Sequence, residues 1–372
     1  MTASVIRRRL TALCASAILG ILVLCGLLAP GTAIARSAPD PVPAMPGVKE
    51  VRFGYFANVT HAQAVLGVDS GDFANAVSPS KFTTKVFNAG PSLIEALFAG
   101  EIDVGYVGPS PALAAHVQSR GQGIKVIAGA AGCGVVIVAR PGSGIHALAD
   151  LKGKRIATPQ LGNTQDVSAR HYLIHVLGQE NADNVVPVPN AEQASMMDRG
   201  QIDAAWAVEP WGARLIAEAK GEVIAEEKDL WPEKNFTLTL VVASPDFLRD
   251  HPDVVERLLK VHAQWTDRLA EAPASHVPAL TAALEKLTSK KLSQQIVSAA
   301  IARVKFTTEP LADSMKTFAQ WAYDLKQART VADVSTLVDT TLLHKISPST
   351  AAPAAAPTPH APSQTGATPG DR

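Results

Sequence analysis

The sequence predicts an α/β fold of two lobes, in which short buried strands alternate with helices. Residues 100–110 and 200–210 carry this prediction, because each starts with a glycine that can end an amphipathic helix in a left-handed conformation. Each then runs as Gly-x-Ile-Asp into a short apolar strand that stops near a proline. Since ligands of open α/β sheets bind beyond the carboxyl ends of the strands, two such units predict two lobes facing each other across a cleft.

Length, composition and charge set limits on the class of protein. The chain has 372 residues, enough for two domains of ordinary size, and 47% of them are hydrophobic. Lys and Arg together number 34, as do Asp and Glu, and no basic block follows the N-terminal region. This balance argues against a nucleic-acid partner.

Residues 1–35 have the pattern of a secretory signal peptide. Residues 7–9 are arginines, an apolar run follows over 10–29, and Ala-Ile-Ala at 33–35 offers a cleavage site. We expect cleavage after residue 35 and export to the periplasm or another extracytoplasmic space; an uncleaved membrane anchor is the alternative. Cleavage leaves Cys133 as the remaining cysteine, so we expect no internal disulfide.

The first lobe is expected to open with a strand at residues 51–56 and a second at 83–88. Asn58 or Thr60 suits the N-cap of the helix that follows the first strand. After the apolar strand of the 100–110 stretch, Ser110 is expected to cap a helix whose first residue is Pro111.

The second lobe restarts the same rhythm with strands near 155–158 and 185–188. Asn190 and Gln193 form a capping-box pattern between the latter strand and the helix that ends at Gly200. Alternating strands and helices predict parallel pairing through right-handed crossovers.

The order of these elements predicts the domain boundaries. The second alternating block lies inside the first, so two strands must cross between the lobes and form a hinge. We expect a signal peptide, a Pro-rich spacer, lobe 1, lobe 2 and a disordered tail at residues 1–35, 36–48, 49–134 plus 238–346, 135–237 and 347–372, respectively.

Three loops at strand ends are expected to reach the cleft, and each opens a helix. Helix N-termini present unpaired N–H groups and partial positive charge, so several aimed at one point can bind an anion without Arg or Lys. Plain helix capping is the alternative for any single residue. The loop residues that we expect to bind the ligand are rich in hydroxyl and amide groups: Asn58, Thr60, His61, Gly108, Ser110, Gly162, Asn163, Thr164 and Gln165.

Further residues near these loops have two readings each. Glu209 either holds a cationic group of the ligand or pairs with an arginine of the protein. Trp211 either walls the site or packs in the core. Asp103 and Asp203 occupy matching positions in the two units, and we interpret both as structural.

Catalytic and metal-binding patterns are weak. Cys133 between two glycines is a candidate nucleophile, with a small buried thiol as the alternative. His171 and His175 lie four residues apart on a helix without an acidic residue that would complete a metal site. We therefore expect no catalytic residue, no metal and no cofactor.

Several stretches resemble one known family, and together they span residues 51–343. At these stretches the chain resembles the substrate-binding proteins of ABC importers for nitrate, taurine and aliphatic sulfonates. The matching segments are residues 56–62, 106–112, 151–154, 157–166 and 206–211, with 287–290 and 305–307 fitting the aliphatic-sulfonate branch.

The resemblance implies a type II periplasmic-binding-protein fold and a ligand site built from the loops named above, with Cys133, Glu209 and Trp211 beside them. It further implies a monomer that closes on a small organic anion, foremost an aliphatic sulfonate, and docks on a membrane permease driven by an ATPase. The alternatives are a receptor or sensor for nitrate, bicarbonate or taurine, and an exported enzyme that uses Cys133 covalently.

Overall fold

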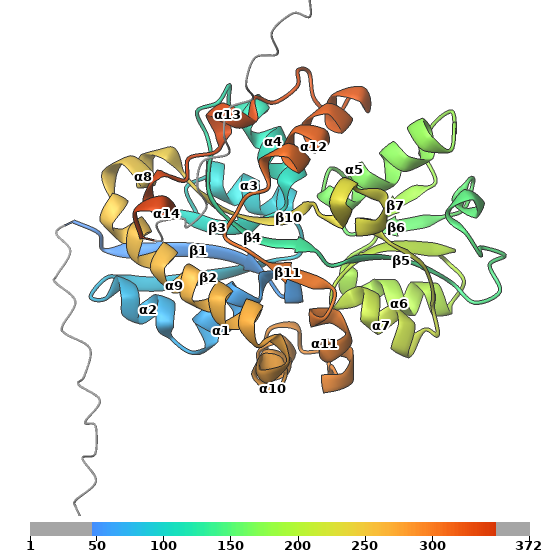
Figure 1. Cartoon of the computed structure of the whole chain (residues 1–372), viewed down its shortest axis with the longest axis horizontal. Coiled ribbons are helices and arrows are strands. Elements are labelled where there is room, and N and C mark those ends of the chain that lie inside the picture. Colours follow the sequence, from blue (N-terminus) through green and yellow to red (C-terminus); the bar gives the residue numbers. More distant parts are fainter. Residues whose placement is uncertain (1–46, 347–372) are drawn as a thin grey trace, which may run out of the picture. The chain divides into compact units, whose positions relative to one another are not determined.

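Residues 47–346 are described by a computed structural model, in which helices cover two β-sheets (Figure 1). This arrangement confirms the predicted α/β class. The predicted signal peptide, nearly all of the spacer and the tail lie outside the described residues. Within the described part, none of the helices combines the length and the apolar character needed to cross a membrane.

The first sheet holds six strands, in the spatial order β11-β4-β10-β3-β1-β2. Strand β1 pairs in parallel with β2 and β3, whereas β10 is antiparallel to β3 and β4, and β11 is antiparallel to β4. The strands are β1 (Glu50–Phe56), β2 (Lys81–Phe87), β3 (Val104–Val107), β4 (Lys125–Cys133), β10 (Thr237–Ala243) and β11 (Val304–Phe306).

The second sheet holds five strands, in the order β7-β6-β8-β5-β9. Strand β6 pairs in parallel with β7 and β8, whereas β5 is antiparallel to β8 and β9. The strands are β5 (Val135–Ala139), β6 (Ile156–Thr158), β7 (Val185–Pro187), β8 (Ala204–Val208) and β9 (Glu222–Glu226).

The predicted parallel pairing is found among the strands that alternate with helices, β1 to β3 and β6 to β8. The strands at the crossing, whose direction was not predicted, pair antiparallel to their neighbours. The chain passes from the first sheet to the second between β4 and β5, and it returns in β10. A strand that leaves a sheet and one that comes back to it run in opposite directions, which explains the antiparallel pairing of β10 with β4. The predicted lobe boundaries and the hinge stay predictions.

Helices cover both faces of each sheet. Helices α1, α2, α9 and α10 pack together beside the first sheet, α6 and α7 pack on each other beside the second, and α12 packs on both α4 and α5. The helices are α1 (Ala62–Asp69), α2 (Asp72–Val77), α3 (Gly90–Phe98), α4 (Pro109–Gln118), α5 (Thr164–His171), α6 (Asn190–Asp198), α7 (Trp211–Glu218), α8 (Pro245–Asp250), α9 (Pro252–Glu271), α10 (Val277–Thr288), α11 (Gln294–Ile301), α12 (Ala312–Asp324), α13 (Val334–Leu337) and α14 (Thr341–Ile346).

The two Gly-x-Ile-Asp units build the same contact in both sheets. Asp103 accepts hydrogen bonds from the backbone N–H of Arg52 at 2.8 Å and from its Nε at 3.0 Å. Asp203 does the same with Arg155, at 3.0 and 3.1 Å. Each aspartate thus binds an arginine on or next to the neighbouring parallel strand. These contacts confirm the prediction that both aspartates have a structural role.

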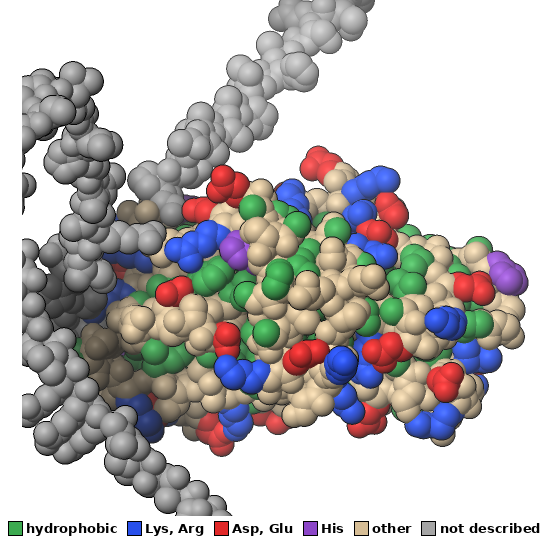
Figure 2. Space-filling model, turned by 90° about the horizontal axis from the view of Figure 1, so that it is seen from below, with side chains coloured by type: hydrophobic (Ala, Val, Ile, Leu, Met, Phe, Trp, Pro, Cys, Tyr) green, Lys and Arg blue, Asp and Glu red, His purple; other side chains and the backbone are tan. Residues whose placement is uncertain are grey.

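Buried apolar side chains join the two sheets. One cluster contains Trp206 of β8 and Leu238 of β10, together with Trp231, Phe236 and Phe318. On the outer surface, the face seen in Figure 2 intersperses acidic and basic side chains, and no large area of that face carries one sign of charge.

Candidate functional site

A polar cavity lies between the carboxyl ends of three parallel strands of the first sheet and three parallel strands of the second. From the first sheet it is reached by the segments that follow β1, β2 and β3, and from the second by those at the ends of β6, β7 and β8. It contains about 360 Å³ of space free of protein atoms, part of it open to solvent. The carboxyl edges of both sheets therefore face one cavity, as the repeated units predicted.

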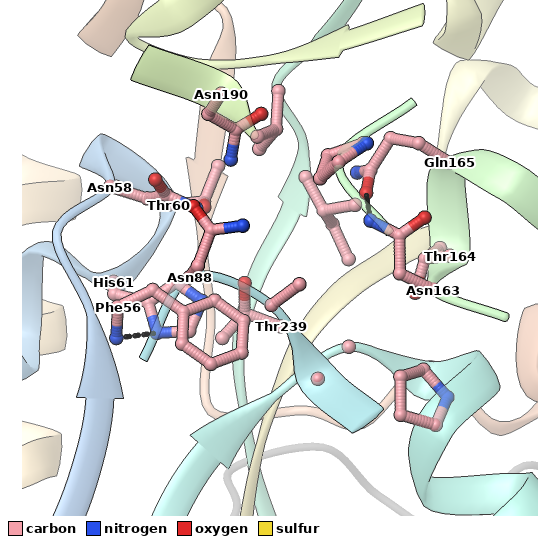
Figure 3. A pocket seen from close by; sticks show the side chains of 17 residues that line it. Phe56, Asn58, Thr60, His61, Asn88, Asn163, Thr164, Gln165, Asn190 and Thr239 are labelled. Carbon is pink, nitrogen blue, oxygen red and sulfur yellow. Dashed lines mark hydrogen bonds between the residues drawn. The ribbon is translucent and has the colours of Figure 1, made fainter. Parts of the chain in front are cut away.

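Seventeen residues line this polar cavity, and ten of them are labelled in Figure 3. Most carry hydroxyl or amide groups or small apolar side chains, and none is Lys, Arg, Asp or Glu. The lining residues are Phe56, Asn58, Thr60, His61, Asn88, Ala89, Gly90, Gly108, Pro111, Pro159, Asn163, Thr164, Gln165, Asn190, Val208, Leu238 and Thr239.

Hydrogen bonds within the protein leave amide donors available at the cavity. The Asn58 Oδ1 atom accepts from the Trp211 indole N–H at 2.8 Å, so its NH2 group remains for the cavity. The Gln165 Oε1 atom accepts from Asn163 Nδ2 at 3.0 Å, which likewise leaves the NH2 group of Gln165 (Figure 3). Asn163 Oδ1 in turn accepts from the Asp166 N–H at 2.8 Å and caps α5.

His61 adds a neutral donor. Its Nδ1 atom faces the backbone N–H of Phe56 at 3.3 Å, and its ring stacks on the Phe56 ring with centroids 4.3 Å apart (Figure 3). Complete burial lowers the pKa of His61 to about 3, so the ring is neutral at pH 7. Since Nδ1 accepts, the single proton of the neutral ring resides on Nε2.

Several buried polar atoms around the cavity have no hydrogen-bond partner in the protein. Four of them, on lining residues, are Thr60 Oγ1, Thr164 Oγ1, Asn190 Oδ1 and Thr239 Oγ1. The fifth is Ser110 Oγ, whose residue lies in the sequence between the lining residues Gly108 and Pro111. An unpaired buried polar group costs about 1–3 kcal/mol. Five such atoms around one cavity are therefore the feature expected of a polar ligand site.

Seven of the twelve predicted ligand residues line the cavity, from both sides of it: Asn58, Thr60, His61, Gly108, Asn163, Thr164 and Gln165. The other five, Ser110, Cys133, Gly162, Glu209 and Trp211, do not belong to the lining. A ligand role stays a prediction for all twelve.

Glu209 and Trp211 make contacts between segments of the two sheets. Glu209 is fully buried and accepts from Arg303 Nη1 at 2.8 Å. This contact corresponds to the predicted alternative in which Glu209 pairs with an arginine of the protein. Its backbone C=O accepts from the Val59 N–H at 3.2 Å. Trp211 is buried and supports Asn58 rather than the lining.

Cys133 sits at the crossing between β4 and β5 with a φ angle of 61°, and its thiol faces the Lys234 C=O at 3.5 Å. Burial raises the pKa of this thiol, which opposes formation of the reactive thiolate. His171 and His175 stack on each other with centroids 5.0 Å apart, and no cluster of three or more metal-binding side chains occurs among residues 47–346.

Three predicted helix caps are wrong. Helix α4 begins at Pro109 instead of Pro111, and Ser110 lies inside its first turn. Asn58 occupies the N-cap of the short 3-10 helix Val59–His61 that leads into α1, but its side chain makes no capping bond, because its Oδ1 atom accepts from Trp211; the N-cap of α1 itself is His61. Asn190 is the first residue of α6, and Gln193 donates to the Val188 C=O at 3.1 Å instead of closing a capping box.

Sequence reasoning missed Asn88, Asn190 and Thr239 as lining residues. Asn88 and Asn190 follow β2 and β7, so the strand-end rule applied to the other loops would have found them. Thr239 lies within the buried strand β10. The sequence signal for it was a threonine that alternates with leucines in an otherwise apolar strand.

We expect replacement of His61 by Asn to reduce the acid sensitivity of folding. The pKa of His61 is about 3 in the folded protein and 6.5 for an ordinary histidine, so the unfolded chain binds more protons between these values and stability falls as pH falls below about 6.5. Asparagine does not titrate in this range, so the variant loses the proton uptake of residue 61 on unfolding. The slope of the unfolding free energy against pH should therefore decrease by about 1.4 kcal/mol per pH unit between about pH 6 and 4. Urea denaturation at several pH values measures the slope.

His344→Asn is the control for this experiment, because it removes an exposed histidine on α14. It should leave the wild-type slope in place. Equal slopes in the two variants would contradict a neutral buried His61.

The sequence matches the NMT1-like family over residues 44–283. A Brucella abortus protein, named a binding protein without a stated ligand, is 28% identical over 213 residues; the match covers 57% of this chain and 64% of that relative. The taurine-binding periplasmic protein of Escherichia coli is 29% identical over 178 residues, 47% of this chain and 53% of the relative.

Solved structures share the fold. The alkanesulfonate-binding protein SsuA of Xanthomonas axonopodis, bound to MOPS, superimposes with a TM-score of 0.67 at 21% identity over 79% of this chain and 99% of that one. The nitrate-binding protein NrtA of Synechocystis gives a TM-score of 0.69 at 14% identity over 80% and 88%. The fold is thus that of the periplasmic binding proteins.

Proposed function

The chain belongs to the NMT1-like family, and from this premise we propose that it is an extracytoplasmic receptor that binds a small organic anion and delivers it to an ABC permease. We propose an aliphatic sulfonate as the ligand. The proposal includes export by the N-terminal signal peptide, a monomeric state, and a permease and an ATPase as partners.

The observation that carries the proposal is a cavity rich in neutral donors. Asn58, Gln165 and His61 each direct a bonded acceptor into the protein, which leaves N–H groups for a ligand. Thr60, Thr164 and Thr239 add hydroxyls without partners. Donors without a fixed positive charge suit a weakly basic oxyanion, because such an anion needs hydrogen bonds more than a counterion.

The apolar part of the lining supports an aliphatic tail. Phe56, Val208 and Leu238 line the same cavity, together with Pro111 and Pro159. A sulfonate presents three oxygens to the donors at one end and methylene groups to these side chains at the other. Nitrate and bicarbonate have no apolar part, so the same wall favours the sulfonate over them.

Closure of two lobes is part of the proposed mechanism. Residues 49–134 with 238–346 form one proposed lobe and residues 135–237 the other. The lining comes from both, so a ligand held by both favours the closed arrangement through its differential affinity. The names of the relatives support this assignment, since they describe taurine-, nitrate- and alkanesulfonate-binding proteins and an ATP-binding protein of nitrate import.

A thermal-shift screen of the purified protein tests the proposal. The panel contains alkanesulfonates of increasing length, taurine, nitrate, bicarbonate, sulfate and inorganic phosphate. We expect alkanesulfonates to raise the melting temperature most, since a ligand at 100 times its Kd adds about 2.7 kcal/mol of stability. A response to nitrate or bicarbonate alone would exclude the sulfonate, and silence across the panel would contradict the anion receptor.

Thr239→Val locates the binding event in the polar cavity. The substitution keeps the shape of the side chain and removes a hydroxyl without a protein partner, so the fold should remain stable while the ligand response declines. Thr317→Val makes the same change at a half-buried position of α12 outside the lining, where the hydroxyl donates to the Asp313 C=O at 3.2 Å, and serves as the control. Equal ligand responses in both variants would remove Thr239 from the site.

A further inference from the structure

A second cavity, lined mostly by aromatic side chains, lies beside the segment by which the chain returns to the first sheet. It contains about 770 Å³ of space free of protein atoms, part of it open to solvent. None of its lining residues lines the polar cavity. The lining of this aromatic cavity is Ser168, His171, Tyr172, Val176, Trp206, Glu227, Leu230, Trp231 and Trp321.

A buried carboxylate stands in this aromatic cavity. Glu227 is 1% exposed, and its Oε1 accepts from the Ser168 hydroxyl at 2.7 Å and from the Trp231 indole at 3.4 Å. Its Oε2 accepts from the Trp206 indole at 2.6 Å. Indole N–H groups can only donate, so these three contacts fit the ionised carboxylate.

The carboxylate has no positively charged partner among the described residues. The adjacent Lys228 pairs with Glu226 at 2.5 Å, and the lining contains neither Lys nor Arg. His171 does not supply the charge either, because burial lowers its pKa to about 4. Burial of an unpaired charge is costly and raises the pKa of Glu227, despite the three hydrogen bonds that lower it.

Aromatic rings surround the same space. Tyr172, Trp206, Trp231 and Trp321 all line it, and the Trp231 and Trp321 rings lie 4.8 Å apart between centroids. Val176 and Leu230 add apolar side chains that are 57% and 36% exposed. Indole and phenol rings attract organic cations through the negative charge at their faces, and the attraction grows when the cation is desolvated.

We propose that the aromatic cavity is a second ligand site, which binds a small organic ammonium ion with apolar substituents. The rings and the apolar lining contact the substituents, and the Glu227 carboxylate neutralises the charge. A metal ion would leave the rings without a role, and a neutral apolar molecule would leave the carboxylate unpaired. The proposal does not depend on the anion site.

The position of this cavity connects it to both sheets. Trp321 belongs to α12, which packs on α4 beside the first sheet, whereas Trp206 lies on β8 of the second sheet. Glu227 and Trp231 lie on the segment that joins β9 to β10. An occupant of the cavity would therefore contact a helix beside the first sheet, a strand of the second sheet and the chain that joins the two sheets.

Titration of the protein with choline, followed by the indole N–H resonances of its five tryptophans, tests the proposal. The neutral isostere 3,3-dimethylbutan-1-ol serves as the uncharged probe. We expect choline to shift the resonances of Trp206, Trp231 and Trp321, and the alcohol to bind at least about tenfold more weakly because it lacks the charge. Trp211 and Trp265, which lie outside the lining, should not respond.

Glu227→Gln removes the charge while it keeps one carbonyl acceptor for the indoles. We expect choline affinity to decrease about tenfold and alcohol affinity to remain unchanged. Glu222→Gln makes the same charge change at an exposed position of β9 and should retain wild-type affinity. If Glu227→Gln fails to fold, Trp321→Leu takes its place, with the same expected loss of choline binding. Equal affinities for choline and the alcohol, or no shift in any of the three resonances, would overturn the proposal.

Discussion

Replacement of Arg303 by Met should lower the free energy of unfolding by about 3–5 kcal/mol, the usual cost of breaking a buried ion pair. Arg303 donates to the fully buried carboxylate of Glu209 at 2.8 Å and to Glu226 at 3.4 Å. Without the guanidinium, Glu209 keeps the backbone N–H of Ala213 as a donor but loses its counterion. Urea denaturation at pH 7 measures the loss.

The pH dependence of this variant identifies Glu209 as the cause. Burial raises the pKa of Glu209 above 4.5, and Ala213 and Arg303 lower it, so loss of Arg303 raises it further. The folded state then holds a proton that the unfolded chain has released, and stability should fall as pH rises above about 4.5. Arg303→Met with Glu209→Gln should recover part of the loss. An equal loss at pH 5 and pH 8, without recovery in the double variant, would contradict this account.

Replacement of Gly108 by Ala should weaken ligand binding about 5- to 150-fold, through an overpacking cost of about 1–3 kcal/mol. A Cβ atom at Gly108 would lie 2.4 Å from the Thr164 hydroxyl oxygen, which belongs to the other side of the polar cavity. Gly108 has a φ angle of −72°, so alanine strains no backbone dihedral there. The effect should therefore arise from the contact across the cavity and appear in calorimetric titrations with the ligand found in the screen.

A double variant separates this clash from other losses. Thr164→Ala removes the hydroxyl. The nearest remaining atom of residue 164 is then its Cβ atom, 3.4 Å from the Cβ atom added at residue 108. Gly108→Ala with Thr164→Ala should therefore bind as well as Thr164→Ala alone. Additive losses in the double variant would show that the two sides do not approach each other when the ligand binds.

The sequence predicted the repeated units of the fold well, because they rest on local rules. Gly100 and Gly200 have positive φ angles of 68° and 69° where the helices end, and the strands β3 and β8 follow as expected. The direction of β10 was not predictable from alternation, because it depends on where the chain crosses between sheets rather than on its own residues.

The sequence predicted which loops line the candidate site, but it did not predict the contacts of individual side chains in them, for one physical reason. Asn58, Ser110 and Asn190 all have side chains suited to helix capping, and local rules assign them to caps. In the structure Asn58 binds Trp211 across the sheets, while Ser110 Oγ and Asn190 Oδ1 have no protein partner. Local rules fail where long-range contacts, or burial beside a polar cavity, determine the surroundings of the same groups.

The interrupted order of the first sheet has a consequence for the way an emerging chain can fold. All five strands of the second sheet lie between residues 135 and 226, so its pairings can form once that stretch has left the ribosome. Strand β4, in contrast, has β10 and β11 as its neighbours, and β11 ends at Phe306. Strand β4 therefore exposes both edges until β10 has emerged and one edge until β11 has emerged, and such edges are prone to aggregate. We therefore expect the second sheet to complete its strand pairing before the first, although its strands begin later in the sequence. Truncated chains that lack β11 should require protection by a chaperone.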